Sequence, residues 1–142
     1  MTATLLYRIA CVLLLLFAIG HTVGFLKFVP TTKEGVAVRD AMDSVQFPFG
    51  SGKFTYGGFY RGFGLFCTAY LLFLAFLAWH IGGMAQTNPQ AIATLSWIFF
   101  VLQIASIALS WKYFFAPPIV FSTLIAICCG WASWLIQRAG AQ

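Results

Sequence analysis

Four long runs of apolar residues, separated by shorter polar or proline-containing segments, dominate the order of residues along the chain. Each run holds roughly 20 or more residues, enough for an α-helix rising about 1.5 Å per residue to cross a hydrocarbon core of about 30 Å. We therefore predict four membrane-spanning helices, over about residues 5–26, 59–81, 90–114 and 118–137. On this interpretation residues 1–142 form a single transmembrane domain.

The two short connections indicate how the last three helices follow one another. In the segment TNPQA, Asn88 suits an N-cap and Pro89 suits the first helical position. In APPIV, the paired prolines end one helix, and Pro118 can begin the next. Because short loops join antiparallel neighbours, the pattern predicts an all-α membrane protein, an antiparallel four-helix transmembrane bundle.

The first connection, residues 28–58, is long for a compact bundle, and long loops usually carry structure or function. Its segment TTKE fits a capping box, with Thr31 as the cap and Glu34 reaching back. Four apolar residues then recur at i, i+3, i+4 and i+7: Val38, Ala41, Met42 and Val45. We therefore predict an amphipathic helix at the membrane surface over about residues 32–45.

An aromatic-rich segment, QFPFGSGKFTYGGFYRGFG, follows this helix at residues 46–64. Aromatic residues alternate there with glycines, and aromatic side chains favour the headgroup level of a bilayer. Two interpretations stay open at this point. The segment is either an interfacial belt or a lid over a cavity between the helices.

The composition supports a membrane location and excludes a soluble domain. Of the 142 residues, 61% are hydrophobic and 8% charged, whereas soluble domains have about 45–50% apolar and about 25% charged residues. The net charge is +5, but the lysines and arginines are scattered at the ends of the apolar runs. We therefore expect membrane lipids as partners and no nucleic acid.

The distribution of cations predicts an orientation. Six of the eight lysines and arginines lie on the side of the long loop: Lys27, Lys33, Arg39, Lys53, Arg61 and Lys112. Arg8 and Arg138 lie on the opposite side. The positive-inside rule then places the long loop in the cytoplasm. The first apolar run exceeds the about 7–15 residues of a signal-peptide core, so we expect it to be retained.

No pattern of metal-binding or catalytic residues stands out. The four cysteines form no CxxC pair, and no spacing of cysteine and histidine suits a metal. The chain has no GxSxG segment and no paired carboxylates within the apolar runs. We therefore expect no metal and no cofactor, and a function other than catalysis is favoured.

Several polar residues nevertheless converge on one end of the predicted bundle. His21 lies near the end of the first helix and Arg61 near the beginning of the second, on the same side of the membrane. Ionisable residues within a membrane usually face the bundle interior or water, and histidine can serve as acid, base or ligand. An interfacial histidine bonded to a carbonyl or to water is the alternative. The candidate ligand-binding residues are His21, Tyr60, Arg61, Gln103 and Trp111.

Glycines accompany these residues at the same depth. Two small-xxx-small patterns, Gly20 with Gly24 and Gly58 with Gly62, lie on the first two helices, and Gly64 adds a further small residue. Such patterns let helix backbones approach closely. We predict that these five glycines form a helix crossing near His21 and Arg61.

The segments GHTVGF, VRDAM, GGFYRGFGLF and LSWKYFF carry a resemblance that covers nearly the whole chain. The sequence resembles an uncharacterised family of small bacterial four-helix integral membrane proteins, which have Gly-His at the end of helix one and Phe-Tyr-x-Gly-Phe-Gly at the start of helix two. The resemblance implies the fold and a multi-pass location in the bacterial inner membrane, but no activity. An acidic residue often precedes the Phe-Tyr pair in that family, where this chain has Gly58.

Three functional hypotheses follow. The first is a protein that binds a lipid-like or other hydrophobic small molecule between the first two helices, beneath the long loop. The second is a structural or accessory subunit of a larger membrane complex, or a homo-oligomer. The third and weakest is a membrane enzyme in which His21 is the acid–base group.

Overall fold

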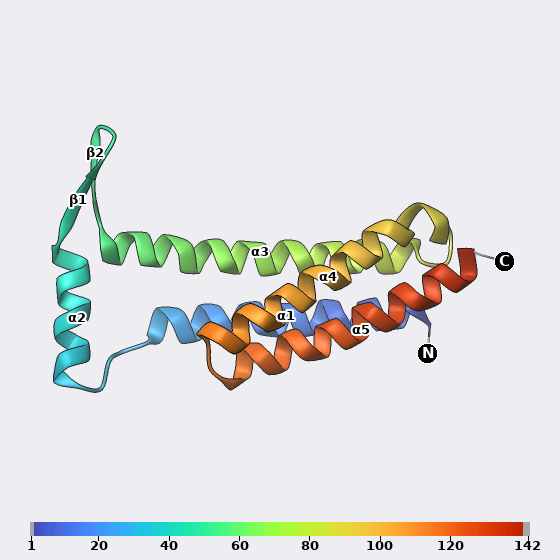
Figure 1. The fold of residues 1–142 in the computed structure, drawn as a ribbon, viewed down its shortest axis with the longest axis horizontal. Coiled ribbons are helices and arrows are strands. Elements are labelled where there is room, and N and C mark those ends of the chain that lie inside the picture. The colour runs from blue at the N-terminus through green and yellow to red at the C-terminus, as the bar shows by residue number, and fades with distance from the viewer. Residues whose placement is uncertain (1, 141–142) are drawn as a thin grey trace. The chain divides into compact units, whose positions relative to one another are not determined.

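The computed structural model describes residues 2–140, which form five α-helices and one β-hairpin (Figure 1). The elements are α1 (Ala3–Lys27), α2 (Lys33–Ser44), β1 (Gln46–Phe49), β2 (Gly52–Thr55), α3 (Tyr56–Met84), α4 (Pro89–Tyr113) and α5 (Ala116–Gly140). Four of these helices, α1, α3, α4 and α5, are long and apolar enough to cross a membrane. The prediction of four such helices is confirmed, and each observed end lies within three residues of the predicted one.

The caps of two helices are resolved in detail. Asn88 caps α4 as predicted, since its Oδ1 accepts a hydrogen bond from the backbone N–H of Ala91. The cap of α2 differs from the prediction, because Thr32 rather than Thr31 occupies the N-cap position. The Oγ1 of Thr32 accepts from the N–H of Gly35 at 3.1 Å, so α2 begins at Lys33. None of the residues of α2 is buried.

The chain divides into two compact units. One contains the residues up to Ala18 together with those from Leu71 onward, and the other is Ile19–Tyr70. The first unit holds α4, α5 and parts of α1 and α3, and it contains the buried hydrophobic core. The second unit holds α2, the hairpin, the end of α1 and the beginning of α3.

The core of the first unit combines large apolar side chains with small polar ones. The rings of Tyr7 and Phe99 stack with centroids 6.2 Å apart, and both residues are fully buried. The buried polar residues are Ser96, Gln103, Ser110, Ser122 and Ser133. Helices α4 and α5 run antiparallel along each other, since Gln90 near the start of α4 donates to the carbonyl of Gly140 near the end of α5. Small polar residues of this kind are typical of contacts between membrane helices.

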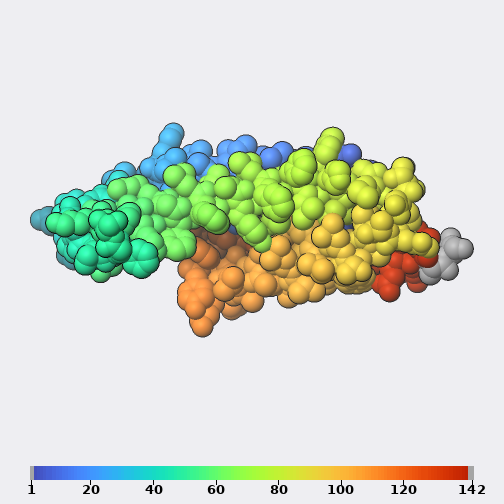
Figure 2. All heavy atoms as spheres, turned by 90° about the horizontal axis from the view of Figure 1, so that it is seen from above, coloured from blue at the N-terminus to red at the C-terminus, as the bar shows by residue number. Residues whose placement is uncertain are grey.

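The hairpin was not predicted from the sequence. Strands β1 and β2 pair antiparallel, with Phe47 opposite Phe54 and Phe49 opposite Gly52. Gly50 has a φ of 59° in the turn, a backbone conformation that favours glycine. In the space-filling view, α2, the hairpin and the first turns of α3 form one continuous surface, coloured cyan to green (Figure 2).

A glycine near the end of α3 lets α1 approach closely within the first unit. A Cβ at Gly82 would lie 2.9 Å from the Cβ of Tyr7, whereas a Cβ at the neighbouring Gly83 would meet no atom within 4 Å. The Tyr7 Cβ is attached directly to the backbone and cannot rotate away. The space at Gly82 is therefore a requirement of the helix contact.

We predict that Gly82→Ala destabilises the protein, because α1 must move to admit the methyl group. Overpacking of this kind costs about 1–3 kcal/mol, and the higher helix propensity of alanine offsets about 1 kcal/mol of it. The free energy of unfolding, measured in mixed micelles of a mild detergent and SDS, should fall. Gly83→Ala is the matched control and should leave it unchanged or raise it; an equal loss in both variants would contradict the role of Gly82.

Candidate functional site

His21 links the end of α1 to the beginning of α3 within the 19–70 unit. Its Nε2 lies 3.0 Å from the backbone carbonyl oxygen of Gly64, and because a carbonyl can only accept, Nε2 carries the hydrogen. The hydroxyl of Thr68 donates to the same oxygen, and it also lies 2.8 Å from the hydroxyl of Thr22 on α1. A small network of hydrogen bonds thus joins the two helices at one level.

Phe25 extends this contact by one turn of α1. Its ring stacks on His21, with centroids 5.8 Å apart and an angle of 5° between the planes. The same ring occupies the space that a side chain at Gly64 would need, and it lies 5.4 Å from the ring of Tyr60. Gly64 is therefore the glycine that makes the close packing between α1 and α3 in this unit.

The C-terminal part of α2 is held against the first turns of α3. Asp43 and Arg61 form an ion pair of 2.7 Å. The carboxylate of Asp43 also lies where a Cβ of Gly57 would be, and Gly57 is buried. Nearer the middle of α2, the Arg39 Nη1 donates to the carbonyl oxygen of Phe28 at 3.0 Å. Charged and backbone contacts thus fasten α2 across the ends of α1 and α3.

These contacts border a half-open cavity with a volume of about 330 Å³, which we call the amphiphilic cavity. Its apolar lining residues are Phe25, Leu26, Phe28, Pro30, Val38 and Met42. Its polar lining is formed by Arg39, Asp43, Tyr60 and Arg61, and Gly35 and Gly57 complete the wall. The lining therefore combines apolar side chains, which we call the floor, with charged groups of both signs, which we call the rim.

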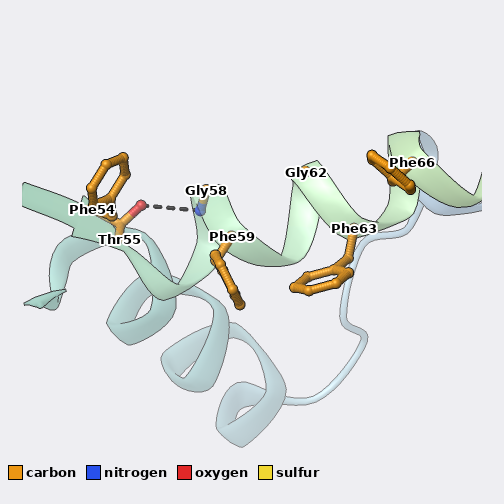
Figure 3. A pocket seen from close by; sticks show the side chains of 7 residues that line it. All are labelled: Phe54, Thr55, Gly58, Phe59, Gly62, Phe63 and Phe66. Carbon is orange, nitrogen blue, oxygen red and sulfur yellow. Dashed lines mark hydrogen bonds between the residues drawn. The ribbon is translucent and has the colours of Figure 1, made fainter. Parts of the chain in front are cut away.

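A second hollow lies along the beginning of α3 (Figure 3). It has a volume of about 490 Å³ and is lined by Phe54, Thr55, Gly58, Phe59, Gly62, Phe63 and Phe66. At about 100° per residue, Gly58 and Gly62 lie about 100° around α3 from Gly57 and Arg61. The hollow has no charged residue in its lining, so its surface is aromatic and apolar.

The structure places the predicted ligand-binding residues in different surroundings. Tyr60 and Arg61 line the amphiphilic cavity. His21 does not line it and contacts it through Phe25. Gln103 and Trp111 belong to the first unit and line neither hollow. Trp111 is exposed, whereas Gln103 is buried and its Nε2 has no hydrogen-bond partner within residues 2–140.

The predicted packing glycines also differ from one another. A Cβ at Gly20, Gly24 or Gly62 would meet no atom within 4 Å, and one at Gly58 would meet only the Oγ1 of Thr55. Of the five, Gly64 alone has another helix packed against it among the described residues. The packing role of the other four stays a prediction.

The predicted site residues did not include several that shape the amphiphilic cavity, among them Phe25, Arg39, Asp43 and Gly57. The available signal was the juxtaposition of an acidic residue near the end of a predicted surface helix and an arginine at the start of the next span. Opposite charges in these positions favour a contact between the two elements. The buried Gly57 had no comparable signal, because its role appears only when α2 is in place.

The four long apolar helices define the class of the protein. Four candidate membrane-spanning helices indicate a multi-pass integral membrane protein. Among the described residues, no group of three or more histidine, cysteine, aspartate or glutamate side chains is placed to hold a metal ion. Comparison of the chain with protein-family models, curated proteins and solved structures finds no match.

We predict that Gly57→Ala loosens α2, because the added methyl group would collide with the Asp43 carboxylate. Hydrogen exchange measured by mass spectrometry should become faster in peptides that cover Lys33–Ser44. Gly62→Ala adds the same methyl group to α3 at a position with open space. Equal rates of hydrogen exchange in the two variants, or rates equal to those of the wild type, would contradict the role of Gly57 in the packing of α2 on α3.

We predict that His21→Phe destabilises the protein modestly, since it keeps the ring but removes the hydrogen bond to Gly64. Hydrogen bonds between membrane helices contribute about 0.6 kcal/mol on average, so the free energy of unfolding should fall by about that amount.

His80→Phe is the control for this variant. His80 stacks on Phe76 with centroids 6.0 Å apart and makes no side-chain hydrogen bond to another described residue. Its replacement should leave the free energy of unfolding unchanged. Equal effects at the two histidines would contradict a contribution from the hydrogen bond between His21 and Gly64.

Proposed function

We propose that this protein is an antiparallel four-helix transmembrane bundle that binds a lipid-like amphiphile in the amphiphilic cavity. The observation that supports this function is the cavity itself, in which apolar side chains from α1 and α2 adjoin charged groups from α2 and α3. Small-molecule sites are typically apolar hollows with a few convergent polar groups. An amphiphile matches both parts of this lining.

The contacts within each unit support the bundle arrangement. In the first unit, the guanidinium of Arg8 on α1 donates to the carbonyl of Trp79 on α3. In the second unit, His21 on α1 meets Gly64 on α3. Later residues of α1 thus pair with earlier residues of α3, as antiparallel neighbours do. We propose that α2 lies at the membrane surface as an amphipathic helix, with Val38 and Met42 directed to the cavity.

Each lining group has a distinct role in this proposal. Arg39, Arg61 and Tyr60 bind the polar end of the amphiphile, whereas Phe25 and Met42 contact its apolar part. His21 is a positioning residue, because it orients Phe25 and ties α1 to α3 without lining the cavity. An acid–base role for His21 has weaker support, since its Nε2 is engaged by a backbone carbonyl.

The location in this proposal is the bacterial inner membrane, with the long loop in the cytoplasm. The family resemblance and the excess of lysine and arginine on that side support it. Anionic lipids of the cytoplasmic leaflet attract such cations. The amphiphilic cavity then opens at the level where lipid headgroups meet acyl chains.

A second candidate function, an accessory subunit or a homo-oligomer, is favoured by one observation. Gly20 and Gly24 lie on one face of α1, and nothing in the described chain fills the space beside them. Small-xxx-small faces of this kind are typical contact surfaces between membrane helices. A neighbouring chain packed against α1 would use them.

We predict that Val38→Trp reduces the amount of amphiphile that co-purifies with the protein, because the larger side chain fills the cavity. Native mass spectrometry of the full chain, released from a mild detergent, measures both the bound mass and the oligomeric state. Val36→Trp makes the same change on α2 at a residue that does not line the cavity. It should retain the ligand.

The two candidate functions give different spectra. Loss of the bound mass in Val38→Trp alone supports amphiphile binding. An oligomer or foreign subunit with no bound amphiphile in the wild type supports the second candidate. A bound mass that is equal in both tryptophan variants would contradict a site beneath α2.

A further inference from the structure

We propose that the molecule bound in the amphiphilic cavity is an anionic, single-chain amphiphile whose headgroup is held by Arg39 and Arg61. This inference rests on the proposed function and specifies its ligand class. It follows from the charge of the rim, from the hydrogen-bond donors that the two arginines still present, and from the size of the cavity.

The rim carries more positive than negative charge. Two guanidinium groups, of Arg39 and Arg61, and one carboxylate, of Asp43, line the cavity. The carboxylate is already paired with Arg61 at 2.7 Å. A cationic headgroup would therefore meet two positive groups and a carboxylate that has a partner, whereas an anionic headgroup balances the remaining charge.

Both arginines have donors to spare for an anion. A guanidinium has five N–H donors arranged as a planar fork that matches carboxylate or phosphate. In the contacts described, Arg39 uses its Nη1 on the Phe28 carbonyl and Arg61 uses its Nη1 on Asp43. The remaining N–H groups of each fork can bind the oxygens of a headgroup.

The ion pair between Asp43 and Arg61 can yield to such a headgroup. Both side chains are about half exposed, at 41% and 53%, and exposed ion pairs contribute little to stability. An anionic headgroup would compete with Asp43 for the same guanidinium. Asp43 therefore competes with the headgroup for Arg61 and opposes its binding.

The size of the cavity limits the number of chains. Its volume of about 330 Å³ lies near the lower end of the range of about 300–1,000 Å³ seen for ligand sites. Phe25 and Met42 are among the apolar lining residues, and the flexible methionine side chain can adapt to a chain. One chain with its headgroup fits this space better than two.

Four amphiphiles with the same twelve-carbon chain test the headgroup. Dodecanoate, dodecyl phosphate, dodecyltrimethylammonium and the neutral dodecyl glyceryl ether are titrated against the full-length protein in phosphatidylcholine nanodiscs. Because hydrogen bonds between charged groups are strong, at least one of the two anions should bind to the protein about tenfold or more tightly than the cation and the neutral ether. Preference between carboxylate and phosphate then separates a free fatty acid from a monoacyl phosphate as the natural source.

Variants of Arg39, Arg61 and Asp43 test whether the two arginines bind the headgroup. Replacing an arginine and replacing Asp43 should change the affinity in opposite directions. Arg61→Gln and Arg39→Gln should each weaken binding of the preferred anion by about tenfold. Asp43→Asn should strengthen it, because it releases Arg61 from its competitor. Lys53→Gln is the control, since Lys53 lies on the hairpin outside the cavity lining and its loss should change nothing.

The outcomes separate this inference from the proposed function. If none of the four amphiphiles binds, the proposed function fails. If all four bind equally, or if the cation binds best, amphiphile binding stands and the anionic ligand is overturned. If Asp43→Asn and Arg61→Gln both weaken binding, the ion pair only holds α2 in place, and the recognition of an anion by Arg61 is likewise overturned.

Discussion

The arrangement of the 19–70 unit depends on one close approach, between the Asp43 carboxylate and the backbone of Gly57. Because position 57 has no side chain, the end of α2 can lie directly on the first turn of α3, and Asp43 can then reach Arg61. A Cβ at this position would collide with the Asp43 carboxylate and lie 3.2 Å from the backbone oxygen of Met42, so α2 would have to shift to admit a side chain. The amphiphilic cavity exists because α2 is held there across the end of α1.

The floor of the cavity depends on a second constraint. Polar side chains within an apolar helix, such as His21, need hydrogen-bond partners. His21 donates to the Gly64 carbonyl, and Phe25 stacks on the His21 ring and fills the space beside Gly64. A polar side chain is thus used to place an apolar one. This explains how a histidine within an apolar helix can shape the amphiphilic cavity without lining it.

Sequence patterns were sufficient for the features that depend on neighbouring residues. Runs of apolar residues located the four spans, and Asn88 with Pro89 located the start of α4. The hairpin and the Gly57 contact were beyond this reasoning, because each depends on residues that meet only after folding. Gly20 and Gly24 are a further example of what sequence patterns leave open. Their spacing indicates a contact surface but does not identify the partner, and nothing in the described chain fills the space beside them.

Photo-crosslinking tests the binding of an amphiphile beneath α2 most directly. A dodecanoate that carries a diazirine near the middle of its chain is irradiated with the full-length protein in phosphatidylcholine nanodiscs, and the labelled peptides are identified by mass spectrometry. We expect labels on the cavity lining, at Phe25, Leu26, Val38 and Met42, and an excess of unlabelled dodecanoate should remove them. Labels spread along the lipid-facing residues of α4 and α5, unaffected by competitor, would contradict a specific site beneath α2.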